Sequence, residues 1–292
     1  MDIFQTYEQR VGQARFIQKL VHEEGDLSSP IDLNISNMTV AELNPLLWCN
    51  YDIPPKKLKL TNTGHTVILS AKWQQERAYL TDGPFLSKFV FSQIHFHWGI
   101  NDMEGSEHRF DGASSPMELH AVHFKSEYRS QELAVSETDG VAVLVYAFKL
   151  QTDPNPELDD IVGNIPFIKN PNSSIRLNPW LITKILRPFT RDYFVYWGSV
   201  PLLNRTHTVL WLISREPIGI SPQQVAEFRT LYDQKYKPLS KNCRSLQELQ
   251  KRHVFHANPS GSLYATLLPI PREPPNLMTG RAATVEEYLA NR

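Results

Sequence analysis

Two histidines separated by one residue, His95 and His97, lie in a run of β-branched and aromatic residues. Alternate side chains of a β-strand point to the same face, so these two imidazoles should share one face, about 7 Å apart. A second strand-like run carries His120 and His123, and antiparallel pairing of the two runs would let one of these complete a set of three nitrogens. Three imidazoles with one open position form a catalytic zinc arrangement, and three nitrogen ligands favour zinc over calcium or magnesium.

A His-x-His pair is a weak signal by itself, because paired histidines are more often surface residues or hydrogen-bonded core residues. Glu118 strengthens the signal, since it stands two residues before His120 and should share its strand face. Zinc-bound imidazoles usually donate their second N–H to a carboxylate or a carbonyl. The pattern therefore predicts a metal site supported by an acid.

Strands must position these groups, and the chain between residues 28 and 256 is predicted to be one mainly β domain. Glycine, proline, asparagine and aspartate clusters separate its strand-like runs, and its helical patterns are few and short. The runs are Lys57–Leu60, Thr66–Leu69, Phe89–Trp98, Met117–Phe124, Val141–Phe148 and Thr208–Ile213. Residues 1–27 should form an extension built on one amphipathic helix over 3–22. Residues 257–292 form a proline-containing tail, either a surface extension or a partner-binding peptide.

Composition excludes several classes of protein. The 292 residues include 30 basic and 31 acidic side chains, so there is no basic excess for binding nucleic acid or an anionic membrane. No stretch approaches the ~18 apolar residues of a membrane span, and the first 25 residues are charged, unlike a secretory signal. The two cysteines, Cys49 and Cys243, are then expected to be thiols. We expect a cytoplasmic protein.

Several segments, taken together, resemble the α-class carbonic anhydrase family. The resemblance spans residues 28–256 with the motifs in family order, and it implies a single domain around a large, twisted, mostly antiparallel sheet. Short helices would cover the surface of this sheet, and zinc would lie at the bottom of a cone. The segments are Ser29-Pro30-Ile31-Asp32, Asn62-Thr63-Gly64-His65, His95-Phe96-His97-Trp98-Gly99, Gly105-Ser106-Glu107-His108, Glu118-Leu119-His120-Ala121-Val122-His123, Tyr193-Phe194-Val195-Tyr196-Trp197-Gly198-Ser199 and Asn242-Cys243-Arg244.

The resemblance also implies roles for individual residues in the reversible hydration of carbon dioxide to bicarbonate. His95, His97 and His120 match the three zinc ligands. Side chains at Gln93 and Glu118 and the backbone carbonyl of Asn242 match the groups that orient those ligands. Val122, Val143, Val200 and Trp211 match the apolar substrate pocket, and His65 matches the proton shuttle.

One segment departs from the family pattern. Between Ser199 and Trp211 the spacing agrees without a gap, so Pro201 stands where the family has a threonine whose hydroxyl orients the nucleophile and bonds the acid at Glu107. Proline has neither hydroxyl nor N–H, and loss of one such bond typically costs on the order of 100-fold in rate. Leu202 replaces a second threonine. Replacing Pro201 by threonine should therefore recover on the order of 100-fold in hydration rate.

Two further expectations follow from the missing threonine. Glu107 is orphaned, so its carboxylate must find water, Tyr196 or another group, or its pKa must rise. A locally shifted register, which would bring Thr206 or Thr208 to the zinc, is the alternative placement.

Two main functions are therefore open. The first is a zinc-dependent carbonic anhydrase with impaired activity, and another reaction of the same centre, such as ester hydrolysis, is a variant of it. The second is a zinc-binding but inactive module that resembles carbonic-anhydrase-related proteins. In that case the altered mouth of the cone or the C-terminal tail would bind a protein partner.

Overall fold

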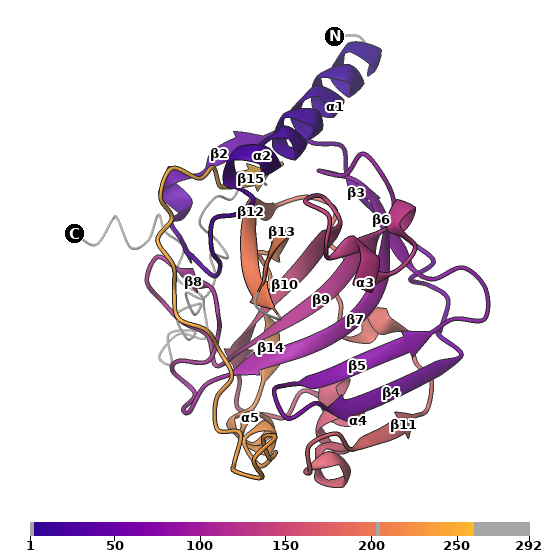
Figure 1. The fold of residues 1–292 in the computed structure, drawn as a ribbon, viewed down its shortest axis with the longest axis vertical. Coiled ribbons are helices and arrows are strands. Elements are labelled where there is room, and N and C mark those ends of the chain that lie inside the picture. Colours follow the sequence, from indigo (N-terminus) through magenta and orange to yellow (C-terminus); the bar gives the residue numbers. More distant parts are fainter. Residues whose placement is uncertain (1–2, 203–204, 260–292) are drawn as a thin grey trace, which may run out of the picture.

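A large twisted sheet organises the chain in the computed structural model, which describes residues 3–202 and 205–259 (Figure 1). In the described part thirteen strands form this sheet, with the path β11-β4-β5-β7-β9-β10-β13-β12-β15-β2. All its neighbours along this path are antiparallel except β10 with β13 and β15 with β2. The predicted mainly β, mostly antiparallel fold is confirmed.

The strands on this path include every strand-like run predicted from the sequence. Their bounds are β2 Thr39–Ala41, β4 Lys57–Asn62, β5 Val67–Lys72, β7 Phe89–Trp98, β9 Met117–Lys125, β10 Val141–Leu150, β11 Ser174–Leu177, β12 Tyr193–Leu202, β13 Arg205–Ser214 and β15 Phe255–Ala257. The other three strands of the sheet lie off this path: β3 Leu46–Cys49, β6 Tyr79–Asp82 and β14 Ile218–Ile220. Strands β1 Asp32–Leu33 and β8 Arg109–Phe110 pair with each other in a separate two-stranded sheet.

Helices are short apart from the first. Those after the N-terminal region are α3 Gln131–Ala134, α4 Asp159–Val162 and α5 Pro222–Phe228. Ser221 caps the N-terminus of α5: its side chain accepts from the Gln224 backbone N–H, while the Gln224 side chain accepts from the Ser221 N–H. No helix in the described residues is long and apolar enough to cross a membrane.

Alternation along the strands divides the apolar core between the two faces of the sheet. β10 shows this most clearly, because its residues are buried on both faces. Ala142, Leu144, Tyr146 and Phe148 join one buried cluster, whereas Val141, Val143, Val145 and Ala147 join the other. The second, smaller cluster lies on the face that also carries the candidate site.

The N-terminal region forms two helices, α1 Ile3–Lys19 and α2 Val21–Glu24, where one helix over 3–22 was predicted. Figure 1 shows α1 projecting away from the sheet at its N-terminal end. Its C-terminal half is docked: Ile17 is buried, and the Trp197 Nε1–H donates to the Ile17 carbonyl at 2.6 Å. One of the side chains that anchor α1 therefore comes from β12.

Strand β15 continues across the expected 256/257 domain boundary, and the boundary itself stays a prediction. Ala257 is the last residue of β15, and its carbonyl accepts from Asp192 N. The Asn258 backbone N–H then donates to the Ala41 carbonyl. Backbone hydrogen bonding to neighbouring strands thus continues past residue 256. The rest of the predicted tail, from residue 260, lies outside the described residues.

Candidate metal centre

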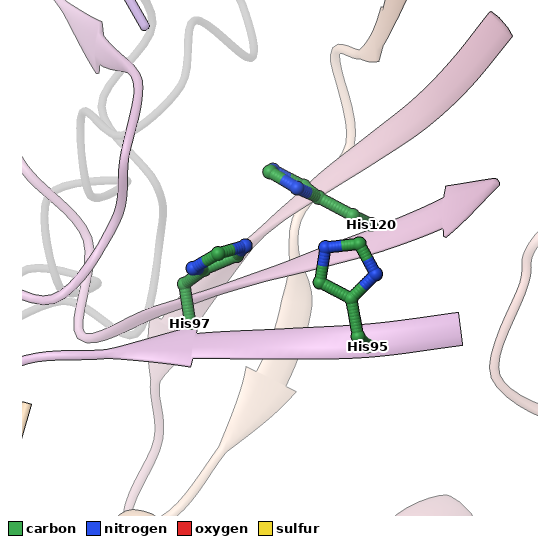
Figure 2. A group of neighbouring side chains, drawn as sticks. All are labelled: His95, His97 and His120. Atoms are coloured by element: carbon green, nitrogen blue, oxygen red, sulfur yellow. The ribbon is translucent and has the colours of Figure 1, made fainter. Parts of the chain in front are cut away.

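Three histidines converge on one face of the sheet (Figure 2). His95 and His97 project from β7, and His120 projects from β9, where it lies directly opposite His95 in the antiparallel ladder. One ring nitrogen from each of the three lies within 4.8 Å of one from each of the others. This is the convergence expected from the His-x-His spacing and the antiparallel pairing.

Each of these rings is held through its other nitrogen. His95 Nδ1 lies 3.1 Å from Gln93 Oε1, and His97 Nδ1 lies 3.2 Å from the Asn242 carbonyl oxygen. His120 Nε2 lies 2.5 Å from Glu118 Oε1. Since these oxygens are acceptors, they fix the tautomer in which the remaining nitrogen of each ring carries a lone pair.

The donor set fits a zinc ion. His97 Nε2 is buried and has no hydrogen-bond partner among the described residues, which is an unusual state for a buried polar atom. Burial lowers the pKa of His97 to about 4 and lowers that of His95 well below its usual value. Both rings are therefore neutral near pH 7, as a metal ligand must be.

Glu118 links the site to a buried polar network. Its Oε1 and Oε2 also accept from Nδ1 and the backbone N–H of His108, at 2.7 and 2.8 Å. His108 Nε2 in turn lies 2.6 Å from the hydroxyl of Tyr196. Burial alone would raise the pKa of Glu118, but His108 and His120 outweigh it and lower that pKa to about 2. The acid behind His120 is therefore ionised.

His123, the other histidine of β9, does not join this set. Its ring is buried and engaged on both nitrogens, with Nε2 2.5 Å from the Tyr51 hydroxyl and Nδ1 3.0 Å from the Ala121 carbonyl oxygen. His123 and His120 are an odd number of residues apart, so they point to opposite faces of β9.

The predicted pocket residues come together in the smaller apolar cluster. Val122 lies opposite Val143 across β9 and β10, and Val143 lies opposite Trp211 across β10 and β13. These three side chains are buried, and the half-buried Val200 packs against the same cluster. The Trp211 ring centroid is 5.2 Å from that of His120, so an apolar wall adjoins the histidines.

His65 lies in the turn between β4 and β5, and its side chain is exposed. Its backbone carbonyl accepts from Asn242 Nδ2 at 3.0 Å. That bond ties the turn to the residue whose own carbonyl holds His97. The shuttle role of His65 stays a prediction.

Pro201 does not lie where the gap-free spacing led us to expect it. β12 and β13 pair without interruption from Tyr193↔Ser214 to Leu202↔Arg205. Strand alternation then places Pro201 on the face of Ser199 and Trp197, opposite the face through which Val200 joins the apolar cluster. The expected position beside the histidines required the strand to break after Ser199, and the strand continues instead.

Pairing geometry explains why proline is tolerated in this strand. The Ser199 N–H points away from β13 and donates to the Leu27 carbonyl. Residue 201 lies two positions further along the strand, so an N–H there would also point away from β13. Proline at this position therefore removes no hydrogen bond between β12 and β13. The shifted register is excluded as well, because Thr206 is exposed opposite Pro201. The buried Thr208 has its methyl group close to Gly25. The Leu202 side chain lies outside what the structure describes.

Glu107 is buried but not orphaned, which corrects the sequence-based expectation. Its partner is Arg244: the Arg244 backbone N–H and Nε donate to Oε1 at 3.0 and 2.8 Å, and Nη2 donates to Oε2 at 2.5 Å. Burial alone would raise the pKa of Glu107, but His97 and Arg244 hold it well below its usual range. Tyr196, the other expected partner, bonds His108 and Ser29 instead.

The sequence pattern missed the role of Arg244. A signal was present, because Arg244 stands two residues after Asn242, the residue assigned to His97. It lies in a coil segment, however, and no periodicity fixes the direction of its side chain there.

Comparisons with known proteins agree with this geometry. The family model described as eukaryotic-type carbonic anhydrase matches residues 12–258. Carbonic anhydrase 3 of Bos taurus is 32% identical over 237 residues, covering 79% of this chain and 89% of that protein. Carbonic anhydrase 6 of Mus musculus is 32% identical over 255 residues, covering 85% and 78%. Carbonic anhydrase 1 of Monodelphis domestica is 31% identical over 258 residues, covering 85% and 96%.

Proposed function

Because the chain belongs to the eukaryotic-type carbonic anhydrase family, we propose that it hydrates carbon dioxide reversibly to bicarbonate and a proton. The observation that carries the proposal is the convergence of His95, His97 and His120, each held through its other nitrogen by an oxygen acceptor. These three residues would hold zinc. Bound zinc supplies a Lewis acid that generates a nucleophile from water near neutral pH.

The chain's own residues would divide the remaining work. The wall formed by Val122, Val143 and Trp211, with Val200 beside it, offers an apolar surface for a small apolar substrate next to His120. Glu118 fixes the orientation of the His120 ring by accepting from its Nε2. His65, exposed in its turn, would exchange protons with solvent, a role for which an imidazole side chain is suited.

We propose that the rate is reduced, because no threonine hydroxyl of the β12–β13 hairpin faces the histidines to orient the nucleophile. The nearest threonines of the hairpin do not supply it, since Thr206 is exposed and Thr208 packs toward Gly25. Loss of one such bond costs on the order of 100-fold or more. A slow carbonic anhydrase is therefore the expected phenotype.

Stopped-flow measurement of carbon dioxide hydration tests the proposal, on protein whose zinc content has been determined. The matched control is the same protein after removal of the metal with a chelator and again after zinc is restored. We expect slow, zinc-dependent turnover that returns on reconstitution. Full zinc occupancy without turnover above the buffer background would contradict enzymatic function.

That contradicting result would favour the second candidate, a zinc-binding module without activity. The observation on its side is the continuous β12–β13 hairpin, which turns Pro201 away from the histidines. A protein partner would then bind the altered mouth or the tail, most of which lies outside the described residues. A cytoplasmic location stays a prediction, and fractionation of cells that express the protein would test it.

A further inference from the structure

Glu107 and Arg244 form an unusually complete ion pair next to the candidate site. The Glu107 side chain is fully buried, and its three protein hydrogen bonds all come from one residue. A guanidinium that bonds both oxygens of a carboxylate holds the carboxylate in one orientation and favours its ionised form. The orientation of Glu107 is therefore set by Arg244.

This pair contacts two of the three histidines. Glu107 Oε1 lies 3.4 Å from His97 Nδ1, and Oε2 lies 4.0 Å from His120 Nε2. The segment that carries Arg244 also contacts His97 directly, because the Asn242 carbonyl accepts from its Nδ1. The coil segment of residues 242–244 therefore supports the His97 ring in two ways. The Asn242 carbonyl accepts from the ring directly, and the Arg244 side chain holds Glu107 beside the same ring.

The hydrogen-bonding capacity of Glu107 is largely used by this arrangement. Oε1 accepts two bonds and Oε2 accepts one, all from Arg244. A hydroxyl brought to the site from the β12–β13 hairpin would have only the remaining lone pair of Oε2 to bond. The remaining Arg244 nitrogen, Nη1, makes no hydrogen bond within the described residues, and the side chain is 29% exposed.

We propose that Arg244 is a positioning residue of the metal site, which clamps Glu107 and through it sets the orientation of His97 and His120. The inference deepens the proposed function and rests on zinc being the ion held there. It predicts that zinc affinity depends on Arg244 although this side chain is not a ligand. Supporting groups of this kind typically contribute 10–100-fold to metal affinity.

Zinc affinity, measured by competition with a chelator, tests the proposal in Arg244→Gln and Arg244→Lys. We expect Arg244→Gln to weaken zinc binding about 10–100-fold, and Arg244→Lys to recover part of the loss, because lysine keeps the charge but not the two-point contact. The matched control is Arg187→Gln, which breaks the exposed Arg187–Glu157 pair and should leave zinc affinity unchanged.

A spectroscopic readout separates positioning from stability. The visible absorption of cobalt(II) in the site reports ligand geometry, and we expect it to change in Arg244→Gln and not in Arg187→Gln. A merely structural pair would lower the melting temperature of the metal-free protein and leave both zinc affinity and the cobalt spectrum as in the parent. That result would overturn the proposal.

A double variant avoids the loss of folding that Arg244→Gln alone could cause. Arg244→Gln leaves a buried carboxylate alone and so tends to unfold the protein, whereas Glu107→Gln/Arg244→Gln removes both charges and should fold. We expect this double variant to bind zinc as weakly as Arg244→Gln, and parental affinity would overturn the inference. Absence of hydration by the parent would defeat the proposed function alone, because neither readout depends on turnover.

Discussion

Strands β7 and β9 and the β12–β13 hairpin both adjoin the histidine site, but they determine its chemistry differently. In β7 and β9 the functional side chains follow from strand alternation and register, which bring His95, His97 and His120 together. In the hairpin the same regularity has the opposite effect, because unbroken pairing carries Pro201 to the other face. Regular strand pairing therefore brings the candidate metal ligands together in β7 and β9, whereas in β12 it points residue 201 away from them.

The largest effect is expected when a histidine ligand of β7 is removed. His97→Ala should weaken zinc binding by more than the roughly 100-fold typical of losing a supporting contact, since it removes a ligand. Metal analysis after dialysis against a chelator measures the change. His123→Gln is the control: His123 is another buried histidine of the site's strands and is bonded to Tyr51, so its replacement should preserve zinc content. Equal zinc loss in both variants would mean that the ligand set is wrong.

Glu118→Gln tests whether the support behind β9 matters as the geometry indicates. The amide keeps the size of the side chain but loses the charge that holds His120 and His108. We expect zinc affinity to fall about 10–100-fold. Glu127→Gln, in the exposed 3-10 turn Ser126–Tyr128 that follows the same strand, provides the control. Unchanged affinity in Glu118→Gln would show that the register of β7 and β9 suffices without the acid.

Pro201→Thr tests the hairpin side. The gap-free spacing predicts a gain on the order of 100-fold in hydration rate, but strand alternation predicts less than about tenfold. We expect the smaller gain, because the new hydroxyl would point away from the histidines and Arg244 already uses most of the hydrogen-bonding capacity of Glu107. Pro201→Ala controls for loss of the ring alone. A 100-fold gain specific to threonine would place residue 201 at the metal.

The smallest effect is expected at His65. A shuttle limits turnover only when hydration is fast, so in a slow enzyme His65→Ala should change the maximal rate by less than about twofold. Rates measured at low and high imidazole concentration check this directly. A larger loss, restored by added imidazole, would mean that proton transfer already limits the rate and that hydration is not impaired.

The sequence was sufficient where a residue's place depends on strand periodicity. The Phe89–Trp98 and Met117–Phe124 runs became β7 and β9, and the two-residue spacings 95/97 and 118/120 each share a face. Periodicity could not decide between His120 and His123 by itself, because that choice depends on which face of β9 meets β7. The resemblance supplied that choice.

The sequence was insufficient where the chain is aperiodic or where a strand could either end or continue. Ser199 begins such a stretch, and nothing local to it shows that β12 runs on to Leu202. The Arg244–Glu107 pair joins residues 137 positions apart through a coil segment, so no local pattern predicts it. Both determine the immediate surroundings of the metal site more than its ligands.

Pro201 has one more consequence, which concerns contact between molecules. The outer edge of strand β12 is paired with β15 over Tyr193–Val195 and with residues 27–29 at Ser199, and the strand runs on to Leu202. A bare strand edge with free N–H groups is a template on which another chain can add a strand. At position 201 there is no N–H to offer, so Pro201 weakens this edge as a point of attachment for β-strand addition and aggregation.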